Sequence, residues 1–143
     1  MRATTLLVLA AAVLGCGTGA AVSWGPLAVM HTDGGMQARN EGTLVLNDQC
    51  VFLERGGERV LLLWPANETS WSPATSEIVF RRVDGDVVTL RDGERVVLGG
   101  GSFSTTVDGL NGEKVPRRID WVAEPDPGCI ADGRWLVSDV DTE

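Results

Sequence analysis

Few residues of this sequence have the types and spacing that catalysis or metal binding requires. His31 is the only histidine, so a Ser-His-Asp or Cys-His site would have to use that one residue. Ser102 and Ser104 follow three glycines but lack the context of a nucleophile elbow. The 20 acidic residues are scattered, so no pair can be assigned as general acid and base. We therefore expect no cofactor and favour a protein without catalytic activity, although an enzyme stays open.

The first residues contain a pattern typical of export. Arg2 precedes nine consecutive apolar residues, Leu6 to Leu14, which is the length of the apolar region of a signal peptide. Val13-Leu14-Gly15-Cys16 then resembles the lipobox of bacterial lipoproteins. The resemblance implies lipid transfer to the Cys16 thiol, cleavage after Gly15 and acylation of the new amino group. Residues 1–15 are then a signal peptide, and two acyl chains anchor the protein stably to a membrane.

The same stretch permits another interpretation. Gly15, Gly17 and Ala20 fit the G-x-G-x-x-A pattern with which S-adenosylmethionine-dependent methyltransferases hold their cofactor. That loop must open an amphipathic helix within alternating strands and helices, and the residues that follow show neither. We therefore favour export.

Two other forms of export also fit the pattern. No residue between Arg2 and Asp33 is charged at neutral pH, so a single membrane span is conceivable, although several glycines and Pro26 interrupt it. Cleavage by a conventional signal peptidase near Ala20 or Ala21 would instead release a secreted protein. Lipid anchoring, spanning and secretion all place the rest of the chain outside the cytoplasm.

The three cysteines bear on the same question, because an odd number leaves one thiol unpaired in an oxidising compartment. The resemblance to lipoproteins implies that Cys16 carries lipid and that Cys50 and Cys129 can form a disulfide. Such a bond closes a loop of about 80 residues, which stabilises the fold by about 4 kcal/mol in the loop-entropy model. Two buried free thiols are the alternative. A zinc site is disfavoured, because two distant cysteines and one histidine do not make a ligand set.

The five tryptophans supply most of the aromatic surface, since the sequence has no tyrosine. Trp64, Trp121 and Trp135 are expected in the core, since tryptophan is highly buried on average. Trp71 lies in the polar segment ETSWSPATS and is the best candidate for an exposed ligand contact, because indoles commonly stack on sugar rings.

Acidic residues gather at two places, which suggests calcium as one interpretation. These residues are Asp84, Asp86, Asp139, Asp141 and Glu143. They lack the regular offsets of a calcium loop, so we expect hairpin turns and a solvated C-terminus, and no metal. The side chains of Arg81 and Arg82 must point to opposite faces of a strand, so pairing of one of them with an acid at the rim of the fold is an alternative. We favour solvated strand ends for both.

The chain after the signal peptide divides into a tether, residues 16–41, and a domain, residues 42–143. Short β-branched and apolar runs bounded by turn residues predict strands, and no segment shows a helical stripe. The predicted strands are 43–46, 50–54, 59–64, 77–82, 86–91, 94–99, 102–107, 119–123 and 134–140. Asp92-Gly93 predicts a hairpin between two of them. The fold class is therefore all-β, either a small antiparallel barrel of the oligonucleotide/oligosaccharide-binding (OB) type or a sandwich.

The formal net charge of −8 disfavours nucleic acid as a partner, because an acidic surface repels phosphate backbones. The expected function is that of a membrane-anchored binding or structural module of the bacterial envelope, with a glycan or protein as its partner. An extracytoplasmic hydrolase of glycan or cell-wall material is the alternative, and secretion is the alternative location.

Overall fold

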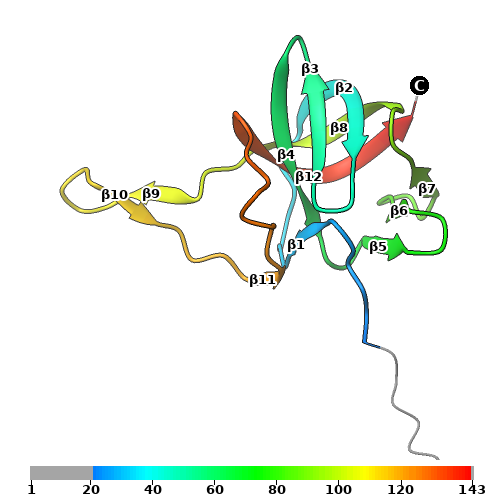
Figure 1. Ribbon diagram of the computed structural model, residues 1–143. Helices are drawn as coiled ribbons and strands as arrows, with labels where there is room; N and C mark the ends of the chain where they lie inside the picture. Colours follow the sequence, from blue (N-terminus) through cyan, green and yellow to red (C-terminus); the bar gives the residue numbers. More distant parts are fainter. Residues whose placement is uncertain (1–20, 143) are drawn as a thin grey trace, which may run out of the picture.

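The protein is all-β in the computed structural model, which describes residues 21–142 (Figure 1). The strands are β1 (Ala28–Met30), β2 (Ala38–Leu46), β3 (Val51–Arg55), β4 (Glu58–Pro65), β5 (Thr69–Ser72), β6 (Glu77–Arg81), β7 (Val87–Leu90), β8 (Arg95–Ser102), β9 (Thr106–Asp108), β10 (Lys114–Pro116), β11 (Trp121–Ala123) and β12 (Gly133–Thr142). No helix within this range is long and apolar enough to cross a membrane. The expected all-β fold class is confirmed.

Five strands close into a barrel in the order β2-β3-β4-β12-β8, because β8 pairs with β2 to complete the circuit. β2, β3 and β4 form an antiparallel meander, and β4 lies parallel to β12, with Trp135 opposite Leu62. This is the strand order of an OB-type barrel. The barrel is therefore not purely antiparallel, because β4 and β12 are parallel neighbours within it. Outside the circuit, β1 also lies parallel to β4.

The strands of the barrel bury apolar side chains on both faces. In β4, Leu62 and Trp64 belong to the cluster inside the barrel, and Leu61 and Leu63 belong to a second cluster outside it. All four side chains are almost fully buried. An apolar run without alternation is what a strand covered on both faces requires.

A small antiparallel sheet of β5, β6 and β7 is inserted between β4 and β8 and closes one end of the barrel. Ile78, Phe80 and Leu90 from this sheet join the inner cluster, where the ring of Phe80 meets that of Trp64 edge-on at 6.2 Å. The prediction of a hairpin at Asp92-Gly93 is wrong. The turn exists, but β7 pairs with β6 and β8 pairs with β2 and β12, so the turn passes the chain from the small sheet to the barrel.

The folded unit begins before residue 42, so the expected tether is too long. Trp24 packs against the inner cluster, β1 pairs with β4 and β11, and the first half of β2 pairs with β8. Leu27 and Val29 are buried in the domain, because they complete its core.

A covering segment, residues 117–132, lies over the outer face of β3 and β4. It includes β11, and its Ile119, Trp121 and Cys129 pack with Phe52 and Leu61 of the barrel in the outer cluster. The predicted Cys50–Cys129 disulfide is confirmed and ties this segment to the β2–β3 loop. The outer face of these strands, where many OB-type barrels bind ligands, is therefore covered by the chain itself.

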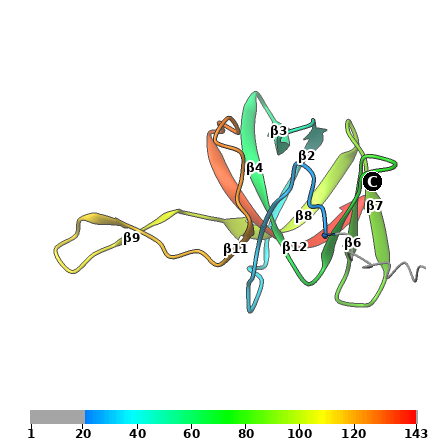
Figure 2. The ribbon, with the colours of Figure 1, turned by 60° about the horizontal axis from the view of Figure 1, so that its bottom comes forward.

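The hairpin of β9 and β10 forms an arm that extends away from the barrel (Figures 1 and 2). Its residues belong to neither buried cluster, and Leu110 at its tip is fully exposed.

Candidate functional site

A groove of about 500 Å³ lies at the seam between the small sheet and the barrel. The β2–β3 loop forms one wall, and the β5–β6 and β7–β8 turns form the other. The residues that line this Trp71 groove are Gly25, Pro26, Leu46, Asn47, Asp48, Trp71, Thr75, Ser76, Arg91 and Asp92. The β2–β3 loop is one of the two loops with which OB-type barrels contact ligands.

Trp71 is placed at this seam by the register of the small sheet. It lies opposite Ile78, which in turn lies opposite Leu90, so all three side chains share the face that covers the barrel. Ile78 and Leu90 are fully buried, whereas Trp71 on the edge strand β5 is half-buried. The indole therefore forms part of the groove wall instead of standing free on a loop.

Gly25 packs directly against the indole of Trp71. A methyl group at this position would overlap the Cε2 and Nε1 atoms of the ring. The backbone of Gly25 also has a φ of 53°, a left-handed conformation that favours glycine. One side of the indole is thus held by backbone.

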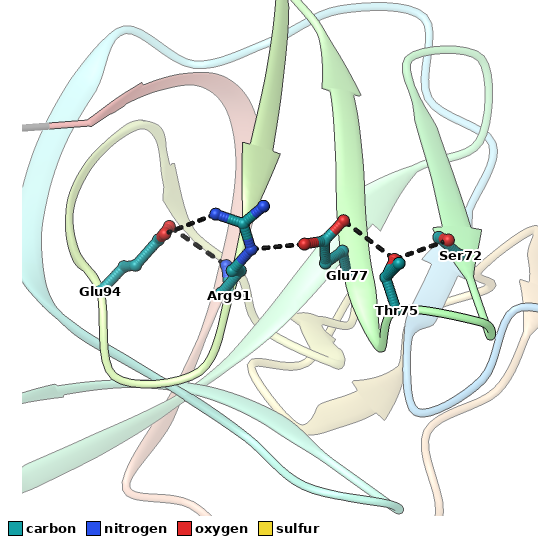
Figure 3. Close-up of polar contacts among 5 residues, drawn as sticks. All are labelled: Ser72, Thr75, Glu77, Arg91 and Glu94. Carbon is teal, nitrogen blue, oxygen red and sulfur yellow. Dashed lines mark hydrogen bonds and ion pairs between the residues drawn. The ribbon is translucent and has the colours of Figure 1, made fainter.

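A row of polar contacts crosses the small sheet beside the groove (Figure 3). Arg91 pairs with Glu94 at 4.0 Å and is hydrogen-bonded to Glu77. The hydroxyl of Thr75 donates to Glu77 at 2.9 Å and lies 2.8 Å from that of Ser72. The hydrogen bonds from Arg91 and Thr75 lower the pKa of Glu77 and hold it as a carboxylate, and the same pairing raises the pKa of Arg91.

The β2–β3 loop presents polar groups to the groove. The side-chain oxygen of Asn47 accepts hydrogen bonds from the backbone N–H groups of Gln49 and Cys50, each at 2.9 Å, which leaves its amide donors available. Asp92 accepts from the N–H of Leu46 at 2.8 Å with one oxygen only. Across the groove, Ser76 has a φ of 52°, the single positive value at a non-glycine residue within the described range.

The groove continues past the β2–β3 loop. A smaller hollow of about 240 Å³ shares Gly25, Pro26 and Asp48 with it and is bounded by Glu124 and Asp126 of the covering segment. The two hollows together form an elongated site centred on Asp48, and they bring the β2–β3 loop and the β8–β12 connection together.

A larger groove of about 660 Å³ lies elsewhere, between the β1–β2 loop and the middle of β12. Asp33, Glu68 and Asp139 contribute carboxylates to it, and Met36 and Val83 contribute apolar surface. No aromatic side chain lines it. We regard the smaller Trp71 groove as the better site, because a ring and hydrogen-bonding groups converge there.

The other residues singled out in the sequence are placed as follows. Cys16 and Glu143 lie outside the described residues. Trp64 and Trp135 are buried as expected, and Trp121 is half-buried in the outer cluster. His31 is exposed in the β1–β2 loop.

The aspartates considered for calcium surround an arginine instead. Asp84, Asp139 and Asp141 lie 3.8, 3.4 and 3.2 Å from the guanidinium of Arg82. This arginine pairs with acids at the rim, so the favoured interpretation of a solvated strand end is wrong for it. Within the described range, no group of three His, Cys, Asp or Glu side chains is arranged to hold a metal ion.

Sequence reasoning identified Trp71 but missed its neighbours in the groove. Gly25-Pro26 lies in the predicted tether. Between two predicted strands lies Asn47-Asp48, and at the end of another lies Arg91. A Gly-Pro pair beside apolar residues was the one local signal. Comparisons with protein-family models, curated proteins and solved structures found no match for this chain.

Proposed function

We propose that the protein is a lipid-anchored binding module of a bacterial envelope that holds carbohydrate in the Trp71 groove. The export pattern at Arg2 to Leu14 and the lipobox-like Val13-Leu14-Gly15-Cys16 support the location, although they lie outside the described residues. The Cys50–Cys129 disulfide supports an oxidising compartment.

The observation that carries the binding role is the position of Trp71 opposite hydrogen-bonding groups. Sugars present apolar C–H faces and a rim of hydroxyl groups, so they are bound by an aromatic surface beside amide, carboxylate and hydroxyl groups. The groove offers the indole of Trp71 with Asn47, Asp48 and Thr75. Its acidic surroundings disfavour phosphate-bearing ligands.

The row of polar contacts beside the groove does not supply the acid that hydrolysis would need. A glycosidase needs a carboxylic acid that can protonate the leaving group, which requires a raised pKa. Glu77, next to the groove, has its pKa shifted in the opposite direction. It is therefore suited to positioning Arg91 and Thr75 and not to donating a proton.

The test is an NMR titration of the full chain with a panel of oligosaccharides, in a detergent without a sugar head group. Binding should shift the indole N–H signal of Trp71. Trp71→Ala should weaken binding by about tenfold, and Trp71→Phe should weaken it less, because a smaller ring keeps part of the stacking surface. Val83→Ala, which changes an exposed residue outside the groove, is the control. A panel without any binder, or equal affinity of all variants, would overturn the proposal.

A further inference from the structure

The charge of the groove walls is strongly unbalanced. Four carboxylates line the groove and its continuation, those of Asp48, Asp92, Glu124 and Asp126. Arg91 is the one cation among the lining residues, and it is already engaged by Glu77 and Glu94. A ligand in the groove therefore meets an excess of negative charge, which a low-dielectric concave surface focuses.

The four carboxylates differ in how far they are engaged by the described part of the chain. Asp92 and Asp126 each use one oxygen to accept a backbone N–H, from Leu46 and from Gly128. Asp48 and Glu124 make no hydrogen bond or ion pair with another described residue, and both are exposed. Their charges are available to a bound molecule.

Trp71 adds a second, independent preference for positive charge. The face of an indole attracts an ammonium group more strongly than the face of any other side-chain ring. The indole and Asp48 line the same groove, so one cationic group can meet both kinds of partner. A neutral sugar would gain nothing from this charge preference, and an acidic sugar would be repelled.

We infer that the carbohydrate held in the Trp71 groove carries a positive charge, as an amino sugar with a free, protonated amine does. This inference rests on the proposed carbohydrate-binding function and narrows its ligand class. The amine is bound by Asp48 and Glu124, and the apolar face of the sugar ring lies against the indole.

Two tetrasaccharides with the same β-1,4-linked backbone test the charge directly. One is built of glucosamine and the other of N-acetylglucosamine, and both are titrated calorimetrically into the full chain at mildly acidic pH, where the amines are protonated. The glucosamine tetramer should bind about threefold to tenfold more tightly, because the exposed carboxylates attract its protonated amines through solvent that screens part of the interaction. The difference should shrink as salt is added.

A double variant locates the effect in the groove. Asp48→Asn with Glu124→Gln should remove most of the preference for the glucosamine tetramer over the N-acetylated tetramer. Asp33→Asn with Asp86→Asn removes the same net charge from exposed positions outside the groove and should keep the preference.

The outcomes separate this inference from the proposed function. Equal binding of both tetramers, or binding of other oligosaccharides alone, would overturn the inference and leave carbohydrate binding intact. If no oligosaccharide binds, both fail. Tri-lysine serves as a charge control, and if it binds as tightly as the glucosamine tetramer, the groove recognises charge without a sugar and the inference is overturned.

Discussion

At the residue scale, Gly25 is the position on which the shape of the groove depends most. Its φ of 53° and its contact with the Trp71 indole each disfavour a side chain. Gly25→Ala should therefore lower the free energy of unfolding by about 2–3 kcal/mol. A side chain in the left-handed backbone conformation costs about 1–2 kcal/mol, and the steric overlap with the indole adds the rest. Denaturant titration measures the loss, and the indole N–H signal of Trp71 reports the displacement.

Gly56 provides a matched control for that substitution. Its φ of 57° is nearly the same, but a methyl group there would meet no atom. Gly56→Ala should lower the free energy of unfolding only by the cost of a side chain in a left-handed conformation, and it should leave the indole N–H signal of Trp71 in place. Equal costs at the two glycines with an unmoved indole signal would contradict the packing argument.

Glu77 gives the fold a dependence on acid. Its folded-state pKa is lowered below the ordinary value of 4.5, chiefly by the hydrogen bond from Arg91, so the folded protein binds its proton less readily than the unfolded chain does. The stabilisation is complete above 4.5 and is lost as pH falls toward the lowered value. Wild type should therefore be more stable than Glu77→Gln at neutral pH, with a gap that closes in acid.

Denaturant midpoints of wild type and Glu77→Gln, measured from neutral pH down through 4.5, check this prediction. Glu113→Gln on the arm, where Glu113 accepts from the N–H of Asn111, changes a carboxylate that makes no ion pair within the described range. A gap that stays constant over the whole pH range would show that Glu77 acts through its shape and not through its charge.

At the scale of the elements, local sequence predicts strands well where apolar residues dominate. The runs that contain Leu61 to Trp64 and Val96 to Leu98 lie in β4 and β8 as expected. Three short strands, β1, β5 and β10, were missed, because each has three or four residues and a weak or polar pattern. Their existence depends on partners that the local sequence does not reveal.

Pairing was harder to predict than strand formation. Asp92-Gly93 has the composition of a tight hairpin, yet the N–H of Gly93 bonds to the carbonyl of Leu44, and Asp92 caps Leu46. The turn is held by β2, which is more than 40 residues away in the sequence. The Trp71 groove is assembled from such long-range contacts, which explains why sequence reasoning found the tryptophan and not its site.

The disulfide controls the covering segment. Removing it with the double substitution Cys50→Ala and Cys129→Ala should lower the free energy of unfolding by about 4 kcal/mol, since the bond closes a loop of 79 residues. Hydrogen exchange should rise in residues 117–132 more than in β8 and β12. Without the disulfide, this segment is held by the short β1–β11 pairing and, at its end, by two hydrogen bonds between Arg59 and Asp132. A uniform rise across the barrel would contradict this local role.

The arm should contribute little to stability. β9 and β10 pair over three residues each, and their side chains join neither buried cluster. Replacing residues 106–116 with a short Gly-Ser turn keeps the hydrogen bond from Arg117 N–H to Thr105 at the base of the arm. The free energy of unfolding, measured by denaturant titration, should change by no more than about 0.5 kcal/mol. Unfolding of the shortened protein would show that the arm packs against the domain.

At the scale of the whole molecule, the barrel and the small sheet form one unit. They share the inner cluster around Trp64 and Phe80, and Arg82 of the β6–β7 turn pairs with Asp139 and Asp141 of β12. The groove lies between two parts that are joined on both sides, so its walls are held in place before a ligand arrives. Such preorganisation reduces the entropy that binding must overcome.

The start of the fold also limits how far the domain can lie from its proposed anchor. Packing begins at Trp24, so eight peptide units separate it from Cys16, and an extended chain of that length spans about 30 Å at most. If Cys16 is acylated, the domain is held close to the membrane surface.

Intact mass spectrometry of the full chain, expressed in a bacterium with a lipoprotein pathway and kept non-reduced, tests this anchoring. The wild type should begin at Cys16, carry acyl chains and retain the Cys50–Cys129 disulfide, and it should fractionate with membranes because two chains suffice for stable attachment. Cys16→Ser should lose the lipid and leave the membrane fraction while keeping the disulfide and its unfolding midpoint, since Cys16 precedes the packed residues. A mature chain that begins near Ala21 with no lipid would show secretion instead, and an unprocessed chain that stays in the membrane would show a span.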